Sequence, residues 1–338
     1  MLPSMSGRIL PLLLLPLLAL AQATQARVLE AKIDKVTTAV ATLQDVEVRL
    51  EWPANAGQGR LRLTAKQVVA PDLGYRFERL TWECPLQRGN AGQGWLCDGE
   101  IRSAGHRPLK LALDLATAST DAELSGGEAR LSLHRNAAAP DLSRIDLVRV
   151  PVAWSQALLA QAWPAANLKG GLLGGSLDIE AADRRPLRVA GRLGVTQLAL
   201  DTPDGTTAAE GVAGRFDLDF RKSPGLSLVT VDGQLQGGEI LAGNAYLALP
   251  ATPIALNLAA RQQGSGGWEI PQFSWDDGDA MRVEGSLGFA ADASLRDADV
   301  SLHSRDIAPL RPRYLSGWLG LFGLSELQLQ GALSAHLV

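Results

Sequence analysis

Apolar and polar residues alternate along most of this chain, which is the pattern of a β-strand with one buried face. The clearest stretches are 46–52, 61–63 and 109–115, where Val, Leu or Trp alternates with charged or small residues. The pattern resumes after residue 186, with turn signals such as Pro203-Asp204-Gly205 between its segments. We expect roughly sixteen to eighteen strands, mainly in an antiparallel sheet. The phase slips between Leu228 and Val231, where we expect a β-bulge.

Two stretches have helical rather than alternating spacing. Trp154 and Leu158 lie one turn apart in the first, after Pro151, and Tyr314 and Trp318 do so in the second, which we place at 308–323. Each is followed by a strand pattern that contains Gly. A shift of 160 residues aligns the two units without a gap, so the sequence predicts an internal repeat with two short amphipathic helices. Trp154, Leu158, Tyr314 and Trp318 are expected on the apolar helix faces.

The N-terminus has the form of a secretory signal, because Arg8 precedes an apolar run at 9–20 and small residues follow at 21–26. The run is shorter than the ~20 residues of a membrane span. We expect cleavage near Ala23 or Ala26, with retention as an N-terminal anchor as the alternative. No Cys follows the run, which excludes lipid modification of an N-terminal Cys.

The chain is divided by these signals into three parts. We expect a leader at 1–26, an N-terminal β region at 27–150 and a helix-initiated β repeat at 151–338. Residues 327–338 have a strand pattern with no closing element after them. We expect a longer natural chain, or an open edge strand that awaits a partner.

The two cysteines, Cys84 and Cys97, both lie in the exported part, where an even count favours a disulfide. Trp82 and Trp95 each precede a Cys by two residues, which indicates a hairpin whose arms are joined by residues 85–93. A zinc site lacks its other ligands, and no Cys-x-x-Cys redox motif occurs. We expect a structural Cys84–Cys97 disulfide.

Composition and motifs argue against nucleic-acid binding and catalysis. The 338 residues carry a formal net charge of -4, and the basic residues form no cluster. The four histidines are isolated from one another, and residues 276–279 (Asp-Asp-Gly-Asp) are better explained as a hairpin turn than as a metal site. No nucleophile elbow or phosphate-binding loop occurs. We expect a protein that is not an enzyme and has no metal or cofactor. The histidines are His106, His134, His303 and His336.

The apolar face of so long a sheet must be covered in some way. Sandwich, barrel and gutter all remain open on the alternation alone. A membrane barrel is disfavoured, because the 8 Trp, 3 Tyr and 6 Phe are few for its aromatic girdles.

The chain resembles the AsmA-like group of repeating β-groove proteins, closest to the YdbH branch and more distant from the TamB branch. The resemblance is carried by the leader, by Gly-punctuated strands such as 189–193 and 283–287, and by the helix-then-strand units at 151–179 and 308–338. It implies a long curved antiparallel sheet that forms an open hydrophobic groove. Phospholipid acyl chains slide along such a groove while their head groups stay in water.

The resemblance implies a periplasmic protein of the cell envelope, a phospholipid conduit between the inner and outer membranes. Envelope proteins are its other expected partners. The leader looks cleavable, unlike the usual anchor, and a groove on the order of 75–80 Å is short for bridging an envelope alone. The expected lining residues are Leu61, Leu63, Leu111, Leu113, Leu193, Phe216, Leu218, Leu228, Leu256 and Leu258.

Two other functions are kept as alternatives. One is an assembly or structural factor of the envelope or outer membrane, which would use an open strand for β-augmentation. The other is an extracellular β-solenoid adhesin, which is weakened by the two helices and by the absence of a strict short repeat.

Overall fold

The computed structural model describes residues 27–338 except 39–40, 55, 90–92, 183–184, 265, 279, 293 and 325. The predicted leader and Asp279 therefore lie outside the described residues. The described strands form one sheet of 20 members. They are β1 (Arg27–Thr37), β2 (Thr42–Trp52), β3 (Gln58–Ala70), β4 (Tyr75–Arg88), β5 (Trp95–Arg102), β6 (Leu109–Leu115), β7 (Ser119–Gly126), β8 (Ala129–Asn136), β9 (Leu142–Pro151), β10 (Asn167–Glu180), β11 (Leu187–Asp201), β12 (Thr207–Ser223), β13 (Leu226–Gln236), β14 (Glu239–Ala242), β15 (Ala245–Ala248), β16 (Ile254–Gln263), β17 (Trp268–Asp276), β18 (Arg282–Phe289), β19 (Leu295–Ser304) and β20 (Leu333–Leu337).

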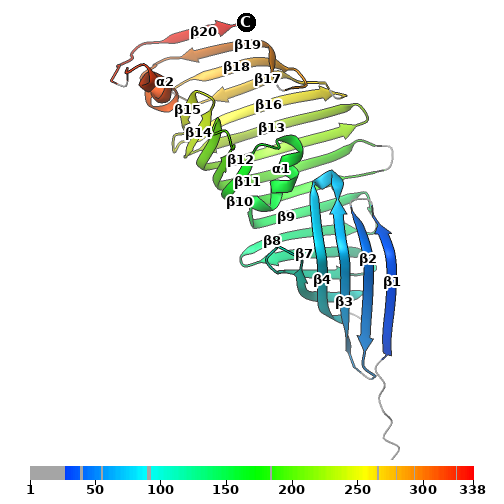
Figure 1. Cartoon of the computed structure of the whole chain (residues 1–338). Helices are drawn as coiled ribbons and strands as arrows, with labels where there is room; N and C mark the ends of the chain where they lie inside the picture. Colours follow the sequence, from blue (N-terminus) through cyan, green and yellow to red (C-terminus); the bar gives the residue numbers. More distant parts are fainter. Residues whose placement is uncertain are drawn as a thin grey trace, which may run out of the picture.

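The sheet is an antiparallel meander in which each strand pairs with the next along the chain. The short β14–β15 hairpin is the exception. It pairs with the first part of β12, so β13 pairs directly with β16. Figure 1 shows the result as a long, twisted, open band. The predicted mainly antiparallel sheet with two short helices is confirmed.

Two β-bulges keep the apolar side chains of long strands on one face. In β9, Leu147 and Val150 are three residues apart, yet they pair with Gly175 and Leu173, which are two apart. The extra residue, Arg149, has a φ of 51°. Gln197 is the extra residue in β11, where it lies between Val195 and Leu198 and has a φ of 54°. Each extra residue restores the phase and bends the strand.

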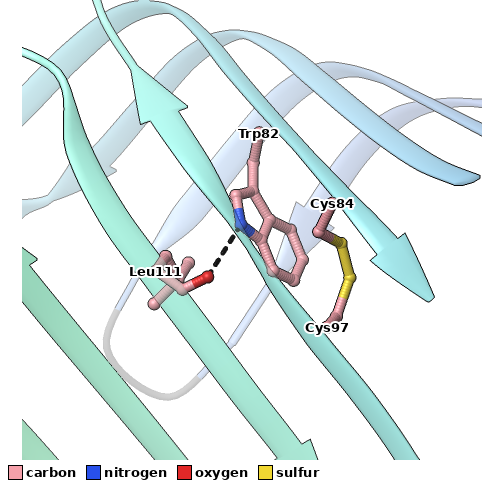
Figure 2. Close-up of a disulfide and its surroundings, with 4 residues drawn as sticks. All are labelled: Trp82, Cys84, Cys97 and Leu111. Atoms are coloured by element: carbon pink, nitrogen blue, oxygen red, sulfur yellow. Dashed lines mark hydrogen bonds between the residues drawn. A yellow bond between two sulfur atoms is a disulfide. The ribbon is translucent and has the colours of Figure 1, made fainter. Parts of the chain in front are cut away.

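The predicted disulfide joins β4 and β5, with 5.5 Å between the Cα atoms of Cys84 and Cys97 (Figure 2). Both cysteines are 3% exposed and pack with Trp82. The indole N–H of Trp82 reaches past β5 and donates to the carbonyl oxygen of Leu111 in β6, at 3.1 Å. The expected loop at 85–93 is too long, because β4 continues through Pro85 to Arg88.

The two helical units follow β9 and β19, as the internal repeat predicts. The first is a 3₁₀ turn at Val152–Ser155 followed by α1 (Gln156–Ala162). The second is a π turn at Arg311–Leu315 followed by α2 (Ser316–Leu321). A third short turn, η1 (Pro71–Leu73), joins β3 to β4. No described helix has the length and apolarity needed to cross a bilayer.

The predicted strand over 327–338 is only partly present. β20 begins at Leu333, which pairs with Ser304, the last residue of β19. Residues 327–332 pass the end of β19 and have no strand beside them to complete the hydrogen-bond ladder. Alternating side chains therefore do not form a strand there.

Small-angle X-ray scattering tests this open architecture. At about 4.8 Å per strand the meander extends for about 80 Å, which gives a radius of gyration of about 25 Å or more. A compact chain of this length would have about 20 Å. A measured radius near the compact value would contradict the open sheet.

Candidate functional site

Directly opposed residues in an antiparallel sheet project from the same face, so the strand register traces rows of side chains across the sheet. One row crosses every strand of the meander from β5 to β20 without a polar side chain. We call it row A. Its members are Gly99, Leu111, Leu124, Leu131, Leu147, Gly175, Leu193, Phe216, Gly233, Leu256, Trp275, Val283, Leu302 and Ala335.

A second row, row B, runs beside the first, two residues away along each of these strands. It is also apolar throughout. Together the two rows make a continuous apolar track, and two residues of strand separate them by about 7 Å. The members of row B are Cys97, Leu113, Ala122, Leu133, Ile145, Leu177, Gly191, Leu218, Val231, Leu258, Phe273, Gly285, Val300 and Leu337.

Glycines in row A and next to it make room for a large side chain of that row, Phe216. A Cβ atom placed on Gly233 would lie 2.5 Å from the ring of Phe216, and one on Gly214 would lie 2.7 Å from it. The ring therefore lies along the sheet over these two glycines instead of standing upright. Because the ring of Phe216 lies along the sheet, it protrudes less from the apolar face, and this face is flatter there than the size of a Phe side chain suggests.

Nine of the ten predicted lining residues lie on this face. Row A holds Leu111, Leu193, Phe216 and Leu256, and row B holds Leu113, Leu218 and Leu258. Leu61 and Leu63 in β3 pair with Cys84 and Trp82 and pack against the disulfide cluster, as Leu111 and Leu113 do. All nine are partly exposed rather than fully buried.

The prediction that Leu228 lines this face is wrong. Leu228 pairs with Arg221 and Arg261 on the opposite face and is 36% exposed. The expected bulge between Leu228 and Val231 is absent, because β13 runs in unbroken register with both neighbours. Val229 and Val231 point to the apolar face instead. Alternation allows two phases here, since Leu226 and Leu228 lie in one phase of β13 and Val229 and Val231 lie in the other.

The opposite face is polar and is covered by ion pairs between neighbouring strands. Arg192 lies 2.8 Å from Asp217, and Arg188 lies 2.7 Å from Asp219. Hydrogen bonds from Arg221 and then Arg188 lower the pKa of Asp219 to about 2. Such exposed pairs contribute little stability, but they keep this face hydrated. A shallow hollow of about 560 Å³ on it is lined mainly by polar side chains of β11–β13, β16 and β17.

Both helical units lie over the apolar face near one end of the strands. A Cβ atom on Gly126 in β7 would lie 2.6 Å from Leu109 and 3.7 Å from the indole of Trp154. The hydroxyl of Tyr75, at the start of β4, donates to the carbonyl oxygen of Trp154. The first unit therefore connects the beginning of the sheet to β9, as Figure 1 shows with α1 beside the β3–β4 turn.

The second unit is anchored by a residue that sequence reasoning assigned only to a turn. Asp277, which is 3% exposed, accepts hydrogen bonds from Arg313 and from the hydroxyl of Tyr314, each at 2.7 Å. The indole of Trp275, a member of row A, donates to the same hydroxyl at 3.0 Å. Burial and then the hydrogen bond with Asp277 raise the pKa of Tyr314. Only its burial, invisible in the sequence, distinguishes Asp277 from Asp276.

The predicted helix faces are half correct. Trp154 and Tyr314 point onto the sheet, but Leu158 and Trp318 are 49% and 51% exposed. Trp154 lies in a 3₁₀ turn and Tyr314 in a π turn, so the α-helical spacing that grouped them with Leu158 and Trp318 does not hold.

The histidines occupy separate strands or turns. His134 contacts Asp121, and His336 lies 3.1 Å from Asp299. Among the residues that the structure describes, no three metal-ligating side chains gather at one point.

Replacing Asp277 by Asn tests the anchor of the second unit. The amide removes the charge that faces Arg313 in a buried position, which costs about 2 kcal/mol or more. Amide hydrogen exchange in residues 310–321 should accelerate roughly thirtyfold, while the Cys84–Cys97 hairpin is unchanged. Asp276→Asn is the matched control, since Asp276 pairs with Arg282 at the surface. Equal exchange in the two variants would contradict the anchoring role.

Comparison with protein-family models, with curated proteins and with solved structures gives no match, so the residues described above are the basis for assigning a function.

Proposed function

We propose that this chain is a non-enzymatic lipid-transfer protein of the bacterial cell envelope. Phospholipid acyl chains lie along rows A and B, and their head groups remain in water at the rim. The carrying observation is that neither row contains a polar side chain from β5 to β20. A polar side chain in each row at the same strand would interrupt this apolar path for an acyl chain.

The energetics favour an acyl chain as the molecule that covers this face. Each CH₂ group that moves from water to an apolar surface gains about 0.8 kcal/mol. No second layer of described strands covers the rows, and their members other than the disulfide-bonded Cys97 remain at least partly exposed. An ordinary core would leave these side chains covered by protein. A non-directional apolar track also lets a lipid slide, because no position holds it by a specific hydrogen bond.

The disulfide supports a location outside the cytoplasm. A Cys84–Cys97 disulfide is compatible with an oxidising compartment such as the periplasm. The polar face carries the ion pairs that keep the band hydrated. The resemblance to AsmA-like groove proteins points to the same function. It rests on the leader, the Gly-containing strands and the helix-then-strand units of the sequence.

Two pairs of substitutions test the proposal. Leu218→Asp with Leu256→Asp places one charge in each row, and burying an unpaired charge under an acyl chain costs several kcal/mol. The protein should stay folded, because both side chains keep access to water, while bound phospholipid falls by about fivefold or more. Native mass spectrometry of protein exported with its own leader measures the lipid, and thermal melting measures the fold.

The matched control is Leu226→Asp with Leu228→Asp, two leucines of β13 that project from the polar face. This pair should leave lipid loading unchanged. Wild-type protein that carries no lipid would contradict the proposal and favour the envelope-assembly alternative. Unfolding of the Leu218/Leu256 variant without a folded, lipid-poor species would show that the rows are a core.

A further inference from the structure

Strand β1 (Arg27–Thr37) is a long edge that no described strand covers. Only β2 pairs with it, and ten of its 11 residues are exposed. Leu29 and Ile33 are 63% and 42% exposed although they belong to the apolar face. Soluble proteins normally protect a long apolar edge of this kind with a bulge, a proline or inward-facing charges. β1 has neither a proline nor a bulge against β2, and its two charged residues on the apolar face, Arg27 and Lys35, lie near its ends, so no described strand pairs with the outward backbone groups of its centre.

Three apolar rows end at this edge. Leu29, Ala31 and Ile33 pair with Leu50, Val48 and Val46 in β2. Those residues pair in turn with Leu61, Leu63 and Ala65 in β3, and these with Cys84, Trp82 and Leu80 in β4. Any strand added to β1 must therefore offer apolar side chains opposite Leu29, Ala31 and Ile33.

The central residues of β1, from Leu29 to Ile33, are complementary to themselves in one antiparallel register. When two copies are centred on Ala31, Leu29 faces Ile33 of the other copy and Glu30 faces Lys32. The apolar residues then share one face and two opposite-charge pairs form on the other, while Arg27 faces Lys35 and Val28 faces Asp34 toward the two ends of the strand. Centring on Glu30 or Lys32 places two like charges opposite each other at the centre of the pairing, and centring on Ile33 places Lys35 opposite Ala31. A shift by one residue places charged side chains opposite apolar ones.

We propose that β1 pairs with β1 of a second copy of this chain in an antiparallel, two-fold symmetric dimer centred on Ala31. A two-fold axis between the edges makes the same surface complementary to itself. The two sheets join into one, and the apolar face runs without a break from one protomer into its partner. The combined band is about twice as long, about 160 Å at the spacing of neighbouring strands. The interface is independent of whether the face carries lipid.

Cysteine cross-linking tests the register in the full chain, exported with its own leader. In the proposed dimer the two Ala31 residues are opposed, at about 5 Å between Cα atoms. Ala31→Cys should therefore give a disulfide-linked dimer on mild oxidation. Lys35→Cys is the matched control. Two copies of residue 35 lie about 27 Å apart in this register, so no 35–35 cross-link should form.

Charge substitution tests the pairing without a new thiol. Lys32→Glu opposes Glu30 and should weaken the dimer about tenfold or more, as measured by light scattering over a concentration series. Glu30→Lys should do the same. An equimolar mixture of the two variants restores opposite charges across the axis and should dimerise. Monomeric wild-type protein, equal dimerisation of every variant, or cross-linking at residue 35 instead of 31 would each overturn the proposal.

Discussion

The rest of the structure depends on one constraint, the two-residue period of a β-strand, whose phase is kept from strand to strand by the pairing register. Opposed residues must share a face, so apolar residues that alternate in phase with their neighbours project from the same side of the meander. A sandwich would bury that side against a second sheet, and a barrel would close it. Here the described strands do neither, and the bulges at Arg149 and Gln197 preserve the common face where a strand has one residue too many.

Because no second layer of described strands packs on the apolar face, side-chain contacts between strands stabilise the sheet at particular places. The Cys84–Cys97 disulfide and Trp82 hold β4, β5 and β6 together, since the indole bonds to the backbone two strands away. The helical units also link separate parts of the sheet, near one end of the strands. Trp154 connects β9 to Tyr75, and Tyr314 connects β19 to Asp277. Both units leave most of rows A and B uncovered, which is the arrangement that the proposed conduit requires.

Much of this arrangement follows from the sequence, because alternation specifies both a strand and its apolar face. Residues 46–52 and 109–115 alternate without ambiguity, and their strands and faces are as predicted. Leu228 was misplaced because β13 has apolar residues in both phases, and only its neighbours fix the choice. Asp277 was missed because its importance comes from burial beneath Arg313 and Tyr314, which lie 36 and 37 residues away in sequence.

Photo-crosslinking measures most directly whether lipid lies on the apolar rows. A photoreactive phenylalanine analogue is placed at Leu113, Leu193 or Leu258, and in separate variants at the opposite-face neighbours Ala112, Arg192 or Asn257. Each variant is exported in cells whose phospholipids are labelled, and adducts are counted after irradiation. Lipid adducts at the three row positions, with none at their neighbours, are the result expected for acyl chains on rows A and B. Equal labelling of both faces, or labelling of neither in folded protein, would contradict a lipid track.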